Sequence, residues 1–249
     1  MVPMIYHLLL LLCVFPHSEQ SCLLIKSSPL ECDEKQEILD FHNDARNRVA
    51  QGNTKLPQAQ NMWVLKWDEE LAEMAQEWAN NCVYEHNKKL PSSVGENLAQ
   101  HSSTGFGFLD VEQLSKLWYE ESSKYVDIKH LKIQHNARHF TQMVWADTKF
   151  VGCGASIYQN TEEEYDKYET MLVCNYRPAG NINGKKLFEV YDHNNRCTVG
   201  VESVIYRGLC AHDLEHSYGH RMACGGESSL LQSTAIFALV LIICLWLIL

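Results

Sequence analysis

An imidazole and a carboxylate fall at positions where the sequence otherwise places apolar side chains. Residues three or four apart share one face of a helix, and His86 and Glu121 each continue such an apolar series. Burying polar groups without partners costs free energy. We therefore expect these side chains to meet each other or a metal ion, as a polar cluster in a cleft. The apolar residues of the two series are Leu71, Met74, Ala75, Trp78 and Cys82 for the first, and Leu114, Leu117, Trp118 and Tyr125 for the second.

The chemistry open to such a cluster is metal binding or acid–base catalysis. Neutral imidazole and carboxylate groups are good ligands for Zn²⁺ and acceptable ligands for other divalent ions. A histidine and a glutamate could also activate water, as in a metal-dependent hydrolase. The sequence contains neither the H-E-x-x-H pattern of zinc proteases nor a G-x-S-x-G nucleophile turn. We assign no catalytic residue and expect a non-enzymatic binding protein. The alternatives are a hydrolase and a network that only holds loops together.

The elements that must position these residues follow from periodicity and capping. Asp68 and Asp110 each precede a helical pattern and are good N-terminal caps. Residues 95–98 are expected in a connector. Helices early in the chain and two β-rich runs late in it predict a mixed α/β (α+β) fold with an antiparallel sheet. The predicted elements are helices over residues 33–51, 68–86 and 110–125, a short helix or turn from His139, and strands over residues 150–158 and 170–176.

Two further polar residues, His42 and Arg46, belong to the first predicted helix. His42 shares the inward face with Ile38, Ala45 and Val49. Buried polar side chains are as a rule hydrogen-bonded. We therefore expect His42 to be a hydrogen-bonded core histidine and not a ligand, with Arg46 as its structural companion or an ion-pair partner.

The composition is that of an acidic globular chain. Its 249 residues suit one large domain or two small ones, and 46% of them are hydrophobic. The formal net charge is −10, and no stretch is rich in lysine and arginine. Nucleic acid is therefore not expected as a partner.

Both ends of the chain carry apolar segments that resemble targeting signals. Residues 1–21 have the short apolar core and small polar end of a signal peptide, which predicts secretion. Residues 235–249 are uninterrupted apolar sequence, shorter than the roughly 20 residues that span a bilayer, and no cation follows them. This order favours a glycolipid (GPI) attachment signal within residues 230–249 over a transmembrane anchor. Membrane contact is expected through this tail only.

Eight cysteines lie between the two end segments, which contain Cys13 and Cys244. An even number in a secreted protein predicts disulfide bonds, and no C-x2-C spacing indicates a zinc–thiolate site. Spacing alone does not define the pairing. The eight are Cys22, Cys32, Cys82, Cys153, Cys174, Cys197, Cys210 and Cys224.

Four short segments follow one another along the chain: His42-Asn-Asp-Ala-Arg46, Gly95-Glu-Asn-Leu98, His139-Phe-Thr-Gln-Met-Val-Trp145 and Leu172-Val-Cys-Asn-Tyr-Arg-Pro-Ala-Gly-Asn181. In this order they resemble the motifs of the CAP superfamily, which comprises cysteine-rich secretory, antigen 5 and pathogenesis-related proteins. The resemblance covers about residues 32–191. Within the superfamily the chain is most similar to arthropod antigen 5, the venom allergen 5-like proteins.

The resemblance implies a three-layer α-β-α sandwich with a central antiparallel sheet. It also implies a cleft lined by two histidines and two glutamates, which correspond to His86, Glu96, Glu121 and His139. It thereby adds Glu96 and His139 to the two residues that periodicity had singled out. His86 and His139 are the expected ligands of Zn²⁺ or another divalent metal, with a glutamate or water completing the set.

The resemblance also suggests an organisation of the chain and two disulfide bonds. Together with the two end segments, it divides the chain into a signal peptide (1–21), a CAP domain (22–191), a short cysteine-containing extension (192–229) and the apolar tail (230–249). It pairs Cys32 with Cys82 and Cys153 with Cys174. The remaining Cys22, Cys197, Cys210 and Cys224 would then form two bonds in an unknown order.

The family suggests what such a protein binds. Candidate partners are a sterol or a fatty acid, or unidentified extracellular proteins. A further alternative is a venom or salivary effector that acts on host proteins. Relatives that block ion channels carry a dense cysteine-rich module at the C-terminus, and this chain has only three cysteines there, which counts against channel block.

Overall fold

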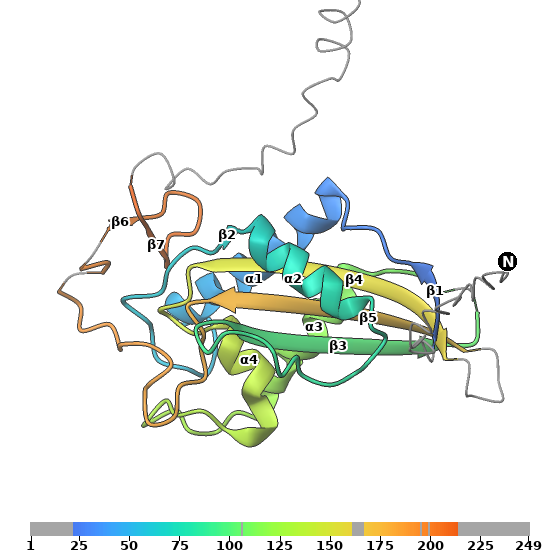
Figure 1. Ribbon diagram of the computed structural model, residues 1–249. Helices are drawn as coiled ribbons and strands as arrows, with labels where there is room; N and C mark the ends of the chain where they lie inside the picture. Colours follow the sequence, from blue (N-terminus) through green and yellow to red (C-terminus); the bar gives the residue numbers. More distant parts are fainter. Residues whose placement is uncertain (1–21, 106, 161–166, 195, 199, 214–249) are drawn as a thin grey trace, which may run out of the picture.

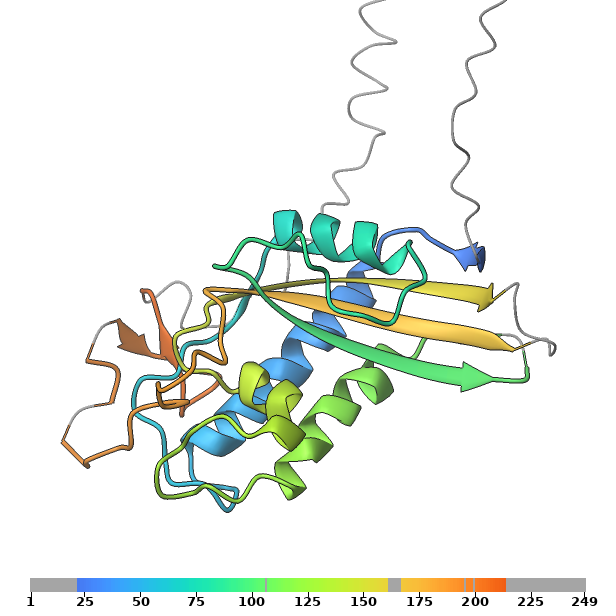
Figure 2. The same ribbon diagram turned by 60° about the horizontal axis from the view of Figure 1, so that its bottom comes forward.

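A five-stranded sheet runs through the centre of the molecule, with helices packed against both of its faces (Figures 1 and 2). This computed structural model describes residues 22–105, 107–160, 167–194, 196–198 and 200–213. The strands of the sheet are β1 (Cys22–Lys26), β2 (Lys66–Trp67), β3 (Gly95–Ser103), β4 (Phe150–Asn160) and β5 (Tyr168–Arg177). They lie in the order β1–β4–β5–β3, and β2 pairs with the start of β4.

The helices form the two outer layers. They are α1 (Cys32–Ala50), α2 (Glu69–Ala79), α3 (Val111–Glu120) and α4 (Arg138–Met143), with 3-10 turns η1 (Glu121–Ser123) and η2 (His135–Ala137). Figure 2 shows α2 on one face of the sheet and α1, α3 and α4 on the other. All strand pairs of this sheet are antiparallel except β2 with β4. The predicted α-β-α sandwich with a central antiparallel sheet is confirmed.

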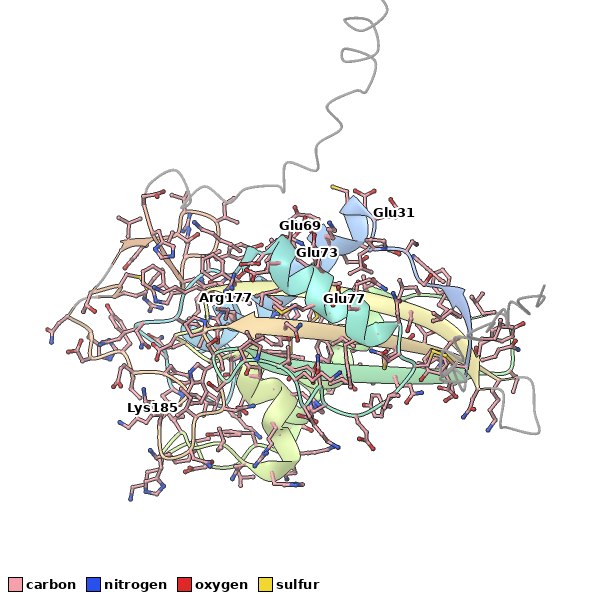
Figure 3. All side chains as sticks on the ribbon, viewed as in Figure 1. Glu31, Glu69, Glu73, Glu77, Arg177 and Lys185 are labelled. Atoms are coloured by element: carbon pink, nitrogen blue, oxygen red, sulfur yellow. A yellow bond between two sulfur atoms is a disulfide. The ribbon has the colours of Figure 1, made fainter. Side chains whose placement is uncertain are left out.

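Capping aspartates begin α2 and α3 as predicted. Asp68 Oδ1 accepts a hydrogen bond from the backbone N–H of Leu71 (3.1 Å), and Asp110 Oδ1 accepts one from Gln113 (2.8 Å). The predicted end of α2 is wrong, because the helix stops at Ala79 and not at His86. Two asparagines follow, and Cys82 then takes a positive φ of 58°, which a continuing helix does not allow. Figure 3 shows Glu69, Glu73 and Glu77 along the outer face of α2.

Of the strands in the main sheet, β1, β3 and the two-residue β2 were not predicted. The segment expected as a connector, residues 95–98, is the first half of β3, which pairs with β5 from Gly95 opposite Tyr176 to Ser103 opposite Tyr168. Its outer half is polar and partly exposed, as in edge strands, so its sequence lacks a β-rich run. β1 forms the opposite edge beside β4.

Gly152 and Gly154 on β4 let the sheet approach α2 closely. A Cβ atom added at Gly154 would lie 2.3 Å from both Cα and N of Gln76, which are backbone atoms that cannot turn aside. We expect Gly154→Ala to lower the free energy of unfolding by about 3 kcal/mol, measured by urea denaturation. Gly105→Ala is the matched control, because its Cβ would meet nothing within 4 Å. Equal midpoints for the two variants would contradict this packing.

One guanidinium group joins α1 to the loops beneath the sheet. Arg46 is fully buried, and its five N–H groups donate to five backbone carbonyl oxygens at 2.8–3.2 Å. The predicted pairing of Arg46 with a nearby side chain is therefore replaced by hydrogen bonds to the main chain. Burial lowers the pKa of Arg46 to about 9, so it remains charged at neutral pH. The acceptors are Trp63, Met143, Trp145, Ala146 and Thr148.

Two disulfide bonds involve strands of the main sheet. The predicted bond between Cys153 and Cys174 is confirmed, and it links paired residues of β4 and β5. The expected pairing of Cys32 with Cys82 is wrong, since Cys82 is bonded to Cys22. The reason is the edge strand β1, which places Cys22 against the end of α2 in one apolar cluster with Ala79 and Tyr158. Cys32 is also disulfide-bonded.

The extension after the sandwich is held by its own disulfide, between Cys197 and Cys210. It contains a small sheet of β6 (Val201–Glu202) and β7 (Cys210–Ala211), at the opposite end of the main sheet from β1 (Figure 1). The predicted signal peptide (1–21), the apolar tail (230–249) and Cys224 lie outside the described residues. Within the described ranges, no helix has the length and apolar character to cross a bilayer.

Candidate functional site

The first histidine–glutamate pair joins the loop after α2 to the start of β3. His86 Nδ1 donates to Glu96 Oε1 (2.9 Å), which also accepts the backbone N–H of Asn87 (2.9 Å). The Glu96 side chain is only 4% exposed, whereas that of His86 is 66% exposed. The prediction of an inward-facing His86 on a helix is therefore wrong, because the loop that replaces the helix presents the imidazole to solvent.

The second pair joins the end of α3 to the start of α4. His139 Nδ1 donates to Glu121 Oε1 (2.8 Å), and Glu121 Oε2 accepts the backbone N–H of His139 (2.9 Å). The helix predicted over residues 110–125 ends at Glu120, and Glu121 begins the 3-10 turn η1. The Glu121 side chain is nevertheless mostly buried, with 18% of it exposed. Burial opposes its ionisation, but the hydrogen bonds and charge of His139 and the N–H of Phe140 outweigh burial. The pKa of Glu121 is consequently lowered.

The two pairs adjoin the same stretch of β3. Asn97, next to Glu96, donates from Nδ2 to the carbonyl oxygen of His139 (3.1 Å). The carbonyl of Leu98 accepts from the indole of Trp118 (2.8 Å) and from the hydroxyl of Tyr84 (3.4 Å). Burial and the charge of Glu121 raise the pKa of Tyr84. Tyr84 therefore lies close enough to the second pair to interact with the Glu121 carboxylate. The predicted site residues thus form two pairs, one anchored on β3 at Glu96 and the other joined to β3 through Asn97.

A buried chain of hydrogen bonds connects the second pair to the core of the protein. His42 donates from Nδ1 to the carbonyl of Ile38 (2.7 Å), so its Nε2 accepts from the hydroxyl of Tyr176 (2.8 Å). That hydroxyl in turn accepts from Asn97 Nδ2 (3.2 Å). The chain therefore runs from α1 to the main chain of His139. His42 is a hydrogen-bonded core histidine, as predicted, and burial lowers its pKa to about 4.

Both site histidines keep one ring nitrogen available. Each imidazole is held through Nδ1 by a carboxylate, and neither Nε2 has a hydrogen-bond partner in the part of the chain that the structure describes. Glu96 Oε2 is buried and likewise has no hydrogen-bond partner. Across the same described residues, no three His, Cys, Asp or Glu side chains lie close enough to hold one metal ion.

Sequence reasoning did not identify Tyr84, Asn97 or Tyr176 as part of this site. Asn97 and Tyr176 lie within the motif segments Gly95-Glu-Asn-Leu98 and Leu172 to Asn181, and that position is the signal that could have singled them out. Tyr84 carries no such signal, because it lies in the loop where a helix was expected.

Comparisons with known proteins agree with this fold and these motifs. The pattern of the CAP family, described as the cysteine-rich secretory protein family, matches residues 39–176. Venom allergen 5 of Rhynchium brunneum is 40% identical over 187 residues, which cover 70% of this chain and 80% of the relative. Venom allergen 5.02 of Vespa crabro is 38% identical over 175 residues, which cover 67% and 85% of the two chains. The chain belongs to the CAP family.

Solved structures give the same result. The crystal structure of NaASP2 with Zn²⁺ is similar with a TM-score of 0.59 and 29% identity, and covers 74% of this chain and 97% of that one. The structure of BmVAL-1 is similar with a TM-score of 0.57 and 27% identity, and covers 73% and 95%. The disulfide bonds of the present chain fit an extracellular protein.

Proposed function

We propose that this protein is a secreted, non-enzymatic binding protein or effector of the venom allergen 5 type, whose two histidine–glutamate pairs bind a divalent metal ion. The observation that carries the proposal is the arrangement of His86 and His139, each oriented by a carboxylate through Nδ1 and each with a free Nε2. Histidines that bind metals in proteins are held in this way by a carboxylate or carbonyl on the second ring nitrogen.

His86 and His139 could supply two ligands to a metal such as Zn²⁺, and water would have to complete the set, since no three ligand side chains lie together among the described residues. Imidazole nitrogen is a preferred zinc ligand, and the unpartnered Oε2 of Glu96 is a buried acceptor that calls for a donor or a cation. The structural neighbour NaASP2 was solved with Zn²⁺, which agrees with this proposal. When bound, the ion would supply a positive charge that attracts anionic or carbonyl groups of a partner. Glu96 and Glu121 would fix the orientation of the two rings.

Metal binding can be measured by titrating the purified protein with Zn²⁺ in a calorimeter at pH 7.4. We expect one site, and we expect the double variant His86→Ala/His139→Ala to lose it. Glu121→Gln should weaken binding about tenfold or more, because the ring loses its charged orienting partner. His130→Ala is the matched control, since His130 forms a similar exposed pair with Asp127 (3.1 Å). Undiminished binding by the double variant would refute the assignment.

The proposal also states that the protein is not an enzyme, and this can be tested separately. A metal-dependent hydrolase would require turnover that a chelator abolishes and that both His86→Ala and His139→Ala lose. We expect no such turnover, because the sequence contains neither the H-E-x-x-H pattern of zinc proteases nor a G-x-S-x-G nucleophile turn. Hydrolysis that depends on these two histidines would replace the binding role by the catalytic one.

A further inference from the structure

A second recess lies away from the two histidine–glutamate pairs, between the end of β5 and the C-terminal extension. We call it the Trp63 groove. Its volume is about 550 Å³, within the range of small-molecule sites. None of the four site residues lines it. The polar and aromatic residues that line it are Asn61, Trp63, Asp147, Lys149, Lys185 and Thr198.

The walls of the groove are held in place by the main chain and a disulfide. Cys197 and Cys210 both line the groove and are bonded to each other. The backbone N–H of Cys197 donates to the carbonyl of Gln60 (2.9 Å), and that of Cys210 donates to the carbonyl of Met62 (2.7 Å). The extension is thereby fixed against the sandwich, so the groove is formed before any ligand arrives.

Trp63 supplies an unused hydrogen-bond donor. Its side chain is buried, with only 8% of the residue exposed, and it contacts the ammonium of Lys149 (4.4 Å from the ring centre) and the ring of His212 (4.5 Å between centres). Its indole N–H has no hydrogen-bond partner among the described residues, yet it is not sealed from solvent. An indole nitrogen can only donate, so it can bond water or an acceptor group on a ligand.

Two lysines and one aspartate line the groove, which leaves it with a net positive charge. Neither Lys149 nor Lys185 forms an ion pair with a carboxylate in the described part of the chain. Figure 3 shows Lys185 at the same end of the sheet as Arg177. Unpaired cations beside a free donor favour an anionic ligand.

The remaining groups narrow the class of ligand. Asp147 lines the same groove and would repel a highly charged anion, but it can accept hydrogen bonds from hydroxyl groups. The Nδ2 group of Asn61 can donate, since its Oδ1 is already used by the backbone N–H of Glu189 (2.9 Å). We propose that the Trp63 groove binds a small organic anion with a single carboxylate or sulfate group on a hydroxylated body, as in an acidic sugar.

The test is a calorimetric titration of the full secreted protein with glucuronate, glucose 6-sulfate and neutral glucose. We expect one or both anions to bind and glucose to bind at least about tenfold more weakly, since charge-assisted hydrogen bonds are lost. Lys149→Met/Lys185→Met should weaken anion binding about tenfold or more. Asp147→Asn should strengthen it about threefold by removing a like charge. Lys116→Met, on α3, is the matched control.

Two readouts separate this site from the metal site and from misfolding. Zinc binding and thermal unfolding of the lysine variants should match those of the wild-type protein, and anion binding should weaken with added salt. The proposal is overturned if neither anion binds, if glucose binds equally well, or if the double lysine variant binds the anions as tightly as Lys116→Met does. Failure of the metal proposal would leave this result unchanged.

Discussion

Replacing Arg46 by lysine is expected to destabilise the protein more than any other single change described above. The five N–H groups of Arg46 satisfy five buried carbonyl oxygens. A lysine has three donors on one nitrogen and cannot span them. Each buried carbonyl left unpaired costs about 1–3 kcal/mol. We therefore expect the free energy of unfolding to fall by about 5 kcal/mol or more, which is comparable with the whole stability of many domains.

The measurement is guanidinium unfolding followed by tryptophan fluorescence. Arg48→Lys is the matched control, because Arg48 lies on the same helix and is exposed. We expect that variant to remain within about 0.5 kcal/mol of the wild type. If Arg46→Lys and Arg48→Lys unfold at the same guanidinium concentration, the stability of the protein does not depend on the hydrogen bonds of the Arg46 guanidinium group.

Acid is expected to destabilise the protein through His42. Burial holds its pKa at about 4 in the folded protein, whereas the ordinary value is 6.5. Below pH 6.5 the unfolded chain therefore binds a proton that the folded protein excludes, so stability falls with pH until about pH 4. A difference of about 2.5 pH units corresponds to about 3 kcal/mol. Protonation would also make Nε2 a donor facing Tyr176, whose hydroxyl would then lose its acceptor.

Urea unfolding at a series of pH values between 7.5 and 4 tests this expectation. His42→Gln cannot titrate and should flatten the dependence of stability on pH, whereas His130→Gln, at an exposed position, should leave it unchanged. If His42→Gln does not fold, the ring of His42 can be followed by NMR in the wild-type protein. A titration midpoint near pH 6.5 would contradict the buried network.

The lowered pKa of Glu121 also makes the protein less stable in acid, but at a lower pH than His42 does. A carboxylate whose folded pKa is depressed contributes stability above its ordinary value of 4.5, and this contribution is lost as the pH falls through the folded value. We expect Glu121→Gln to remove the part of the acid dependence below pH 4.5, while the part between pH 6.5 and 4.5 persists. Loss of both parts in this variant would show that the two groups are coupled.

Local features were predictable because they depend on neighbours in the sequence. The capping aspartates and the strand β4 are of this kind. The pairing of Cys153 with Cys174 was implied by the family resemblance. The edge strands β1 and β3 were missed. Their residues are partly polar or lie next to an end segment, and their strand conformation depends on hydrogen bonds to β4 and β5.

The candidate site likewise has some features that the sequence predicted and others that only the structure showed. Periodicity singled out His86 and Glu121 for partners, but its reason for His86 was wrong, since α2 ends at Ala79. The family resemblance added Glu96 and His139, and the structure pairs each glutamate with one histidine. Asn97 and Tyr176 connect these pairs to the core through side-chain atoms 79 positions apart in the chain. Such contacts leave no local pattern in the sequence.

The amino-acid sequence by itself determined the class of fold, the family and the four residues of the site, because helix caps, strand composition and motifs are written in neighbouring residues. Tertiary structure alone decided that Cys82 bonds to Cys22, that the site consists of two carboxylate-held imidazoles, and that an extension closes the Trp63 groove. The physical reason is that these features depend on strand pairing and on side chains that meet only after distant segments have packed together.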